Sequence, residues 1–437
     1  MPHILDSSAR DFEQKLQTLL NLKREDAPDV DEAVAAIIRD VRARGDDALC
    51  DLTRQFDRFE LTRETITIDP TEVKELSQQV DQAQQEALVM AAERIRAYHA
   101  RQMPNDETWT DSAGATLGWR WTPVRAAGLY VPGGLASYPS SVLMNAIPAK
   151  VAGVEDLAIC VPTPGGQINP LVMAAARIAG VDKIYRVGGA QAIAALAYGT
   201  ETVAPVDIIT GPGNAFVAAA KRQVFGKVGI DMIAGPSEIL VIADAHNDPD
   251  WIALDLLSQA EHDESAQSIL ITTDADFGKA VADAIERLLP TLERENIARA
   301  SWRDNGAIIN VRDLGEAAAI SDRFAPEHLE LCVRDYDALS ANIRHAGAIF
   351  LGAWTPEAIG DYVGGPNHVL PTARSARFSS GLSVHDFLKR TTLAKMTPEA
   401  LGRIGWAAET LAAAEGLGAH GASVTARLRM LNKKDTT

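Results

Sequence analysis

A repeated alternation of short apolar, strand-like runs with longer helical runs dominates the middle of this 437-residue chain. The first series contains DLAICVP, KIYRVGG and VDIITG, separated by the helical runs LVMAAARIAG, AQAIAALAYG and NAFVAAAKRQVFG. The second contains SEILVIAD, SILITTD, GAIINV and HLELCV, interleaved with DPDWIALDLLSQAEH and FGKAVADAIERLL. Strands and helices that alternate in this way build mainly parallel sheets covered by helices. The sequence therefore predicts two α/β units.

The two ends of the chain are predicted to be helical instead. Apolar residues recur at three- and four-residue spacing through most of the first hundred residues, as in DEAVAAIIRDVRARG. After Pro371 the chain turns polar, and TPEALGRIGWAAETLAAAEGL follows with Thr397 placed as an N-cap and Pro398 in the first turn. We interpret this tail as a small, separate helical piece.

The charge balance argues against whole classes of partner. The chain has 42 Lys and Arg against 59 Asp and Glu, a net charge of -17 that repels phosphate backbones and anionic lipid. The start, MPHILDSSARDFEQ, lacks a basic stretch followed by an apolar run, and no segment has the length of uninterrupted apolar sequence that spans a bilayer. We expect a soluble, cytoplasmic protein that binds neither nucleic acid nor membrane, with Cys50, Cys160 and Cys332 as reduced core thiols.

A glycine-containing loop, GPGNAF, follows the strand VDIIT and opens a helix, as a phosphate-binding loop does. The third glycine of the usual dinucleotide fingerprint is missing, because Phe216 occupies its place. Asp231 is an acid at a plausible spacing for a ribose contact, but it lies on no clear second strand. Two interpretations stay open: a nucleotide site, or a tight strand-to-helix turn made by Gly211 and Gly213.

The stretch SQAEHDESAQ places one histidine among a glutamine and three acids. The apolar stripe of the preceding helix passes through Leu256 and continues to Gln259 and His262, so both should face inward. A buried polar group without a partner costs about 1 to 3 kcal/mol, so each needs a hydrogen bond or a metal ion. An acid would be a more usual zinc ligand than an amide, but the periodicity turns Glu261 and Asp263 away from the core.

Two further stretches combine an acid with a histidine. In FAPEHLEL, Glu327 and His328 stand at the entrance of a strand, where they either reach a cleft or form a solvated turn. In AIGDYVGGPNHVLPT, Asp361 and His368 stand in a loop whose glycines permit unusual backbone angles. Such loops often carry chemistry, although a plain surface loop is the alternative.

Together these stretches resemble the histidinol dehydrogenase family over nearly the whole chain. The resemblance rests on LYVPGG, YPSSVLMNAIPAKVAGV, VGGAQAIAALAYGT, TGPGN, DMIAGPSEILVIAD, LLSQAEHD, FAPEHLEL, GDYVGGPNHVLPT and LAAAEGLGAH, in this order. It implies an enzyme that oxidises L-histidinol to L-histidine in two NAD-linked steps through bound L-histidinaldehyde, at the end of histidine biosynthesis. It also implies a homodimer with shared active sites and one Zn²⁺ per subunit.

The resemblance assigns roles to individual residues. It implies that zinc is held by Gln259, His262, Asp361 and His420, the last from the tail of the other subunit. Glu327 and His328 match the acid-base pair. We expect His328 to remove the hydroxyl proton and Glu327 to activate water for the second oxidation. The substrate-binding positions are Ser237, His368 and Glu415, together with His328 and the four metal positions, and the NAD positions are Tyr130, Gln191 and Asn214.

The family likeness also implies a domain plan of two Rossmann-like α/β domains with a helical N-terminal segment and a small helical tail. Residues 1–24 are expected to form a helical arm. Residues 25–130 and 237–381 are expected to form the first α/β domain, which carries the metal and acid-base residues, and residues 131–236 the second, which carries the NAD contacts. Residues 382–437 are expected to form a helical tail that docks on the partner subunit.

Three other functions remain: a dehydrogenase of a different polar alcohol, a zinc hydrolase that uses Glu327 and turns over without NAD, and a non-catalytic metal-binding protein. Glu415 and His420 together favour a substrate with an amine and an imidazole.

Overall fold

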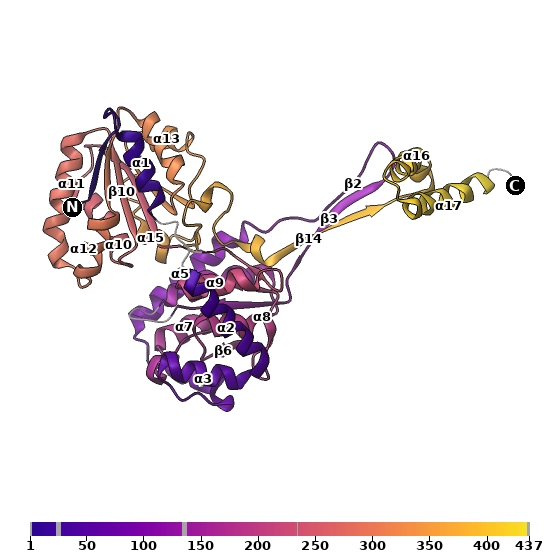
Figure 1. The fold of residues 1–437 in the computed structure, drawn as a ribbon, viewed down its shortest axis with the longest axis horizontal. Coiled ribbons are helices and arrows are strands. Elements are labelled where there is room, and N and C mark those ends of the chain that lie inside the picture. Colours follow the sequence, from indigo (N-terminus) through magenta and orange to yellow (C-terminus); the bar gives the residue numbers. More distant parts are fainter. Residues whose placement is uncertain (1, 23–27, 133–137, 234, 435–437) are drawn as a thin grey trace. The chain divides into compact units, whose positions relative to one another are not determined.

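The computed structural model describes residues 2–22, 28–132, 138–233 and 235–434, so the two glycines that end LYVPGG lie outside the described residues. The chain forms two compact units: unit 1 comprises Met1–Gln102 and Val124–Phe387, and unit 2 comprises Met103–Pro123 and Leu388–Thr437. Unit 1 contains two lobes, each built on its own parallel sheet (Figure 1).

The six-stranded lobe has the strand order β1-β11-β10-β9-β12-β13, and each neighbouring pair is parallel. Its strands are β1 His3–Asp6, β9 Glu238–Ala243, β10 Gln267–Thr272, β11 Ala307–Asn310, β12 His328–Cys332 and β13 Ala348–Leu351. Its helices are α1 Phe12–Asn21, α10 Pro249–Ala260, α11 Ala275–Leu288, α12 Glu295–Asn305, α13 Leu314–Phe324, α14 Tyr336–Ser340 and α15 Glu357–Tyr362. Apolar clusters fill both faces of the sheet, which is why a central strand such as EILVIA is almost wholly apolar.

The five-stranded lobe has the strand order β6-β5-β4-β7-β8, again with each pair parallel. Its strands are β4 Ala126–Tyr130, β5 Asp156–Cys160, β6 Lys183–Tyr185, β7 Ile208–Thr210 and β8 Gly229–Ile230. Its helices are α2 Pro28–Arg44, α3 Asp46–Asp57, α4 Pro70–Ser77, α5 Gln82–Ala100, α6 Pro139–Ala152, α7 Pro170–Ala179, α8 Gly189–Tyr198 and α9 Ala215–Val224.

Both lobes share one winding pattern. In each sheet the first strand of an α/β series is central, the next two strands extend the sheet to one side, and the following two extend it to the other. The winding reverses between β9 and β12 in one lobe and between β4 and β7 in the other. This is the Rossmann-like order, and ligands of such sheets bind where the winding reverses. The predicted fold class is confirmed.

The N-terminal segments divide between the two lobes. Strand β1 pairs with β11, and α1 packs with Leu16 and Leu19 in the core of the six-stranded lobe (Figure 1). Helices α2 and α3 contact α8, whereas α4 and α5 contact α7, so residues 28–100 belong with the five-stranded lobe. The sequence-based plan grouped residues 25–130 with 237–381 instead. An apolar stripe on a helix shows that the helix is covered, but it does not show which sheet covers it.

Unit 2 is a three-stranded antiparallel sheet joined to a helical hairpin. The strands are β2 Glu107–Thr110, β3 Thr116–Pro123 and β14 Leu388–Lys395, in the order β14-β3-β2, and the helices are α16 Pro398–Ala414 and α17 Gly418–Lys434. The hydroxyl of Thr397 accepts a hydrogen bond from the N–H of Ala400 at 3.1 Å, which confirms the predicted N-cap. The strand β14 was not predicted, because LKRTTLAK is exposed along almost its whole length and lacks an apolar alternation.

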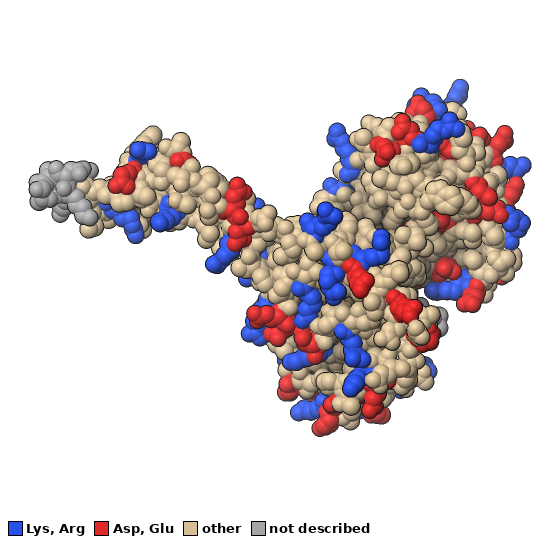
Figure 2. Space-filling model, turned by 180° about the vertical axis from the view of Figure 1, so that it is seen from behind, with Lys and Arg blue, Asp and Glu red and all other residues tan. Residues whose placement is uncertain are grey.

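The charged surface side chains and the three cysteine thiols are as expected from the composition. Figure 2 shows acidic and basic side chains interspersed over one face of the molecule. Within the ranges that the structure describes, no helix is long and apolar enough to cross a membrane. Cys160 and Cys332 are buried in apolar clusters and Cys50 is half-buried, and all three are free thiols, as predicted.

Candidate active site

Glu327 and His328 lie at the amino-terminal start of β12, beside the point where the winding of the six-stranded sheet reverses. Both side chains are buried, which excludes a solvated turn, and Leu329 and Leu331 point into an apolar cluster on the sheet face opposite to that of His328. The backbone of Glu238, the first residue of β9, contacts both. Its N–H donates to Glu327 Oε2 at 2.9 Å, and its carbonyl oxygen lies 3.0 Å from His328 Nδ1. A buried strand start therefore orients the pair.

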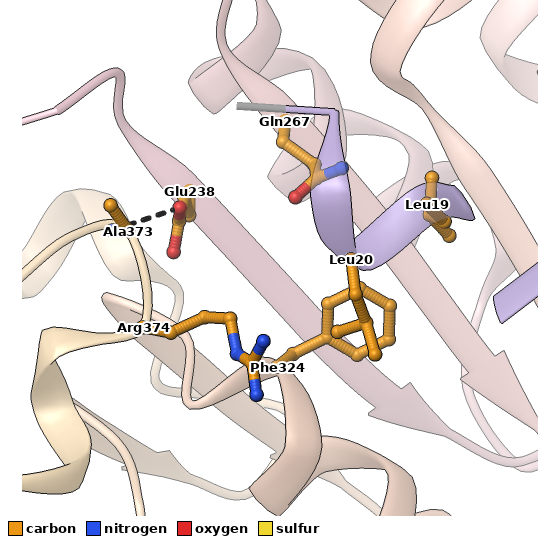
Figure 3. A pocket seen from close by; sticks show the side chains of 7 residues that line it. All are labelled: Leu19, Leu20, Glu238, Gln267, Phe324, Ala373 and Arg374. Carbon is orange, nitrogen blue, oxygen red and sulfur yellow. Dashed lines mark hydrogen bonds between the residues drawn. The ribbon is translucent and has the colours of Figure 1, made fainter. Parts of the chain in front are cut away.

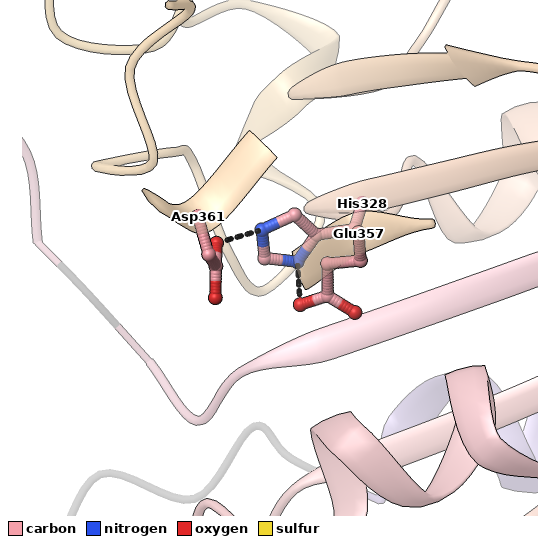
Figure 4. Close-up of side chains that lie close together, drawn as sticks. All are labelled: His328, Glu357 and Asp361. Atoms are coloured by element: carbon pink, nitrogen blue, oxygen red, sulfur yellow. Dashed lines mark ion pairs between the residues drawn. The ribbon is translucent and has the colours of Figure 1, made fainter. Parts of the chain in front are cut away.

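The imidazole of His328 lies between two carboxyl groups (Figure 4). Glu357 Oε1 is 3.2 Å from Nδ1, and Asp361 Oδ1 is 3.8 Å from Nε2. A proton on Nδ1 can be donated to the Glu238 carbonyl, which leaves the lone pair on Nε2. That Nε2 is buried and has no hydrogen-bond partner among the described residues. Burial lowers the pKa of His328 to about 4, against the opposing charge of Asp361, so the ring is neutral at pH 7.

A cavity next to this strand start is lined by Glu238, Ala373 and Arg374. Glu238 Oε1 accepts a hydrogen bond from the N–H of Ala373 at 3.1 Å, and Figure 3 shows Arg374 extending from the same turn toward Phe324 and Leu20. Ala373 and Arg374 have φ angles of 51° and 64°. Non-glycine residues in this region are strained and persist only where their surroundings hold them. This strained turn therefore holds the side chain of Glu238, and the backbone of Glu238 orients the acid-base pair.

Gln259 and His262 lie at the carboxyl end of α10, where the predicted apolar stripe through Leu256 ends. Gln259 is fully buried, and its Nε2 lies 3.1 Å from His262 Nδ1 rather than against the backbone. Gln259 Oε1 is buried without a hydrogen-bond partner among the described residues. The ring of His262 is close enough to lower the pKa of His328 electrostatically. The glutamine and both histidines therefore belong to one group.

Asp361 lies in the last turn of the short helix α15, not in a loop as the sequence predicted. The helix ends one residue after Asp361, and the two glycines that follow at the end of GDYVGG are typical of a loop, which is why a loop was predicted. His368 does lie in the loop that follows. Its Nδ1 is 3.0 Å from the carbonyl oxygen of Asp361, and its Nε2 is 3.3 Å from the hydroxyl of Ser141 on α6. Burial lowers the pKa of His368, so this is not a plain surface loop.

A cavity joins the acid-base pair to the glycine-containing loop of the five-stranded lobe. It is lined by residues of both lobes, including Gly211, Lys221, Asp231, Ser237, Glu327 and His368. Ser237 and Glu327 immediately precede β9 and β12, so the cavity lies at the amino edge of the six-stranded sheet. Ligands of doubly wound sheets usually bind at the carboxyl edge, and only the five-stranded lobe presents that edge to this cavity, through Gly211 after β7.

Comparisons with known proteins identify the family of this chain. A family model described as "Histidinol dehydrogenase" matches residues 20–428. The histidinol dehydrogenase of Ruegeria pomeroyi is 71% identical over 432 residues, which cover 99% of this chain and 100% of that protein. The chain belongs to the histidinol dehydrogenase family. The histidinol dehydrogenase of Cereibacter sphaeroides is 70% identical over 433 residues, with 99% of this chain and 100% of that protein covered.

A solved structure shows the same fold. The crystal structure of histidinol dehydrogenase from Elizabethkingia anophelis has a TM-score of 0.94 and 36% identity to this chain, with 99% of each chain covered. As a member of the histidinol dehydrogenase family, the protein is an enzyme, an oxidoreductase of histidine biosynthesis.

The predicted NAD residues lie around the reversal point of the five-stranded sheet. Tyr130 ends β4, Gln191 is buried in the first turn of α8, and Asn214 is the N-cap of α9. The Tyr130 hydroxyl accepts a hydrogen bond from the N–H of Gly189 at 3.1 Å. Burial raises the pKa of Tyr130 to about 12, so the hydroxyl keeps its proton and can donate it. Asn214 Oδ1 accepts from two N–H groups of α9, at 3.1 and 3.2 Å.

The two predicted tail residues belong to unit 2. Glu415 is the C-cap of α16 and His420 lies in the first turn of α17, and both are exposed on the helical hairpin. Unit 2 thus presents an acid and an imidazole together.

Sequence reasoning missed a set of buried acids behind His328. Glu330 is fully buried in the middle of β12, and its Oε1 accepts from the N–H of Glu357 at 2.6 Å. Asp255 of α10 is close enough to raise the pKa of Glu330 electrostatically. Burial raises the pKa of Glu330 and Glu357 well above the usual range, and raises that of Asp255 to about 6. One signal was present in the sequence: Glu330 stands two residues after His328 in an otherwise apolar strand.

Among the described residues, we consider two groups that could hold a cation. The ligand atoms of His328, Glu357 and Asp361 lie within 4.8 Å of one another. However, Nδ1 is the His328 nitrogen that faces Glu357, and it donates to a carbonyl, while the raised pKa of Glu357 favours a proton on that carboxyl. The predicted group of Gln259, His262 and Asp361 fits better. It offers an amide oxygen without a partner, an imidazole and a carboxylate, which are donors that zinc accepts.

The buried acids predict how stability depends on pH. Because their pKa values are raised in the fold, they bind protons that the unfolded chain releases. The stability they contribute is therefore complete below about pH 4 and is lost as pH rises through 6 and beyond. For Asp255, a change from 3.8 to about 6 corresponds to about 3 kcal/mol.

We therefore expect Asp255→Asn to reduce the loss of unfolding free energy between pH 5 and pH 8 by about 1 to 1.5 kcal/mol, because the rest of the ~3 kcal/mol is already lost below pH 5. Denaturant unfolding of the metal-free enzyme at several pH values measures this. The matched control is Asp283→Asn, which changes an exposed acid on the neighbouring helix α11 and should leave the pH dependence of wild type. Identical pH dependence in the Asp255 variant and wild type would contradict the prediction.

Proposed function

We propose that this enzyme catalyses the zinc-dependent, four-electron oxidation of L-histidinol to L-histidine with NAD, through bound L-histidinaldehyde. Membership of the histidinol dehydrogenase family supports the substrate. The observation that carries the mechanism is the buried imidazole of His328, neutral and with Nε2 unpartnered among the described residues, next to Glu327 at the edge of a cavity. A base and an acid are thus held side by side where a substrate can enter.

In the first oxidation, Nε2 of His328 removes the hydroxyl proton of the alcohol while the carbon loses hydride. NAD, when bound, accepts that hydride. The protonated imidazole is stabilised by the negative charge of Asp361, which lies on the Nε2 side of the ring (Figure 4). General base catalysis of this kind contributes about 10²- to 10⁴-fold.

In the second oxidation, water adds to the aldehyde carbon and Glu327 takes the proton that the water loses. The resulting gem-diol again gives a hydroxyl proton to His328 and a hydride to a second NAD. One histidinol, one water and two NAD therefore yield one histidine, two NADH and the released protons. The carboxyl of Glu327 is oriented for this role by the N–H of Glu238.

Gln259, His262 and Asp361, with His420 of the partner subunit, would hold the zinc. A bound zinc ion would orient the amine and imidazole nitrogens of histidinol. Ser237, His368 and Glu415 would contact the substrate, and Tyr130, Gln191 and Asn214 would contact NAD. Ser237 and His368 line the same cavity as Glu327, which supports their assignment.

The proposal includes a homodimer in which the tail, residues 382–437, completes the site of the partner subunit. The surface of unit 2 supports this. Trp406 and Leu411 on α16 and Met430 on α17 are 65%, 62% and 67% exposed, which is unusual for large apolar side chains on one small hairpin. A second subunit that covers them would also bring His420 to a metal site.

Counting NADH tests the reaction. Purified enzyme supplied with zinc, excess NAD and limiting L-histidinol should form two NADH per histidinol consumed, because the aldehyde stays bound and proceeds to the acid. Absorbance of NADH and chromatography of histidine measure the ratio. A ratio of one with free aldehyde accumulating would contradict the two-step reaction, and a hydrolysed product without NADH would support a zinc hydrolase instead.

A further inference from the structure

The turn between β7 and α9 is held in one conformation by its surroundings. Gly211, the first residue after β7, has a φ angle of 110°, which favours glycine. A Cβ atom at this position would clash with the carbonyl oxygen of Tyr130, so the turn lies directly against the end of β4. Three residues later, Asn214 caps α9. The turn therefore connects two of the proposed NAD residues.

A buried ion pair holds Gly211 by both of its backbone polar groups. Its N–H donates to Asp231 Oδ2 at 2.8 Å, and its carbonyl oxygen accepts from Lys221 Nζ at 3.0 Å. Lys221 Nζ is also paired with Asp231 Oδ1, which accepts a further hydrogen bond from the N–H of Met232 at 2.7 Å. The side chains of the lysine and the aspartate are 2% and 0% exposed. Asp231 is thus committed to the turn and does not serve as the ribose-binding acid considered in the sequence.

The chemistry of the pair points to positioning rather than to stability. Removing two charges from water is costly, and apolar residues of similar volume often stabilise a fold as well as a buried ion pair does. Apolar residues cannot, however, accept from an N–H and donate to a carbonyl of the same residue. Lys221 and Asp231 also line the cavity that contains Ser237, Glu327 and His368.

We propose that Lys221 and Asp231 are positioning residues that fix the 211–214 turn for the bound dinucleotide, in place of the missing glycine of the usual fingerprint. This inference rests on the proposed function. It implies that loss of the pair weakens NAD binding while zinc and histidinol binding are retained, because none of the proposed metal residues belongs to the five-stranded lobe.

The same lobe offers a control pair at the opposite edge of its sheet. Lys150 Nζ is 2.7 Å from Asp182 Oδ2, which also accepts from the N–H of Leu157 at 2.9 Å. This pair lies at the amino ends of β5 and β6, whereas NAD is proposed to bind at the carboxyl edge. Lys150→Met therefore removes an ammonium from a more exposed ion pair of the same lobe without touching the turn.

The test compares three variants of the zinc-loaded enzyme: Lys221→Met with Asp231→Leu in one chain, Lys221→Met alone, and Lys150→Met. The double variant is decisive because it leaves no buried charge without a partner. We expect it to fold, with an unfolding temperature lowered by the loss of the hydrogen bonds to Gly211 and Met232, and to show a KM for NAD raised about 10-fold or more. Its zinc content and its KM for histidinol should stay within about 2-fold of wild type, and Lys150→Met should have a normal KM for NAD.

Two results would overturn the inference. A double variant with wild-type KM for NAD would show that the two charges compensate each other but do not position the turn for NAD. A double variant that does not fold would show that the role of the pair is structural. Wild-type enzyme that forms no NADH from histidinol would defeat the proposed function itself, so the two failures are distinguishable. The single Lys221→Met variant should bind NAD at least as weakly as the double variant.

Discussion

His328→Asn is expected to slow both oxidations, with kcat lowered by about 10²- to 10⁴-fold. The asparagine amide can still donate to the carbonyl of Glu238, which His328 Nδ1 contacts, so the strand start should be preserved. What is lost is Nε2, the atom assigned to take the hydroxyl proton in each step. Stopped-flow measurement of NADH formation from histidinol, and separately from supplied histidinaldehyde, checks both half-reactions.

Glu327→Gln provides the contrast to this variant. Its amide oxygen can still accept from the N–H of Glu238, but the amide cannot take a proton from water. We expect acid formation from supplied aldehyde to slow more than the first oxidation does. Equal losses of rate in the two half-reactions would contradict the assignment of Glu327 as the residue that activates water. A His328→Asn enzyme with wild-type rates would contradict the assignment of His328 as the base.

Mixed dimers should recover activity that neither parent variant has. Asp361→Ala and His420→Ala homodimers are each expected to be nearly inactive, because every site lacks one proposed zinc ligand. In a mixed dimer one shared site inherits both changes, and the other has an intact Asp361 and an intact His420. Random assembly makes about half of the dimers mixed, each with one good site, so co-expression should give about a quarter of wild-type activity.

A second co-expression serves as the matched control. Gln259→Ala and Asp361→Ala both change unit 1, so in their mixed dimers each site still contains one changed residue and activity should not return. Differently tagged chains allow mixed dimers to be purified before assay. Verified mixed dimers of the Asp361 and His420 variants without activity would rule out the shared site, while the oxidoreductase assignment would stand on the family.

The zinc, acid-base, substrate and NAD assignments come from resemblance to the family and remain predictions. The structure nevertheless brings Gln259, His262, Asp361 and His328 into one group. The hydrophobic periodicity alone predicted that Gln259 and His262 face inward, because the face that a helical residue occupies follows from its spacing along the chain. It could not tell hydrogen bonding from metal binding, since that depends on which residues approach from other elements.

The sequence by itself determined the elements and their burial: two α/β series with parallel sheets, a capped helix beginning after Thr397, and a buried strand after His328. Hydrophobic spacing and capping are local properties, and they are readable within one element. Only the tertiary structure decided that residues 28–100 cover the five-stranded lobe, that β14 pairs with β3, and that Asp231 holds Gly211 instead of a ribose. These contacts join segments far apart in the chain, and their partners are set by how the lobes pack, which no local spacing encodes.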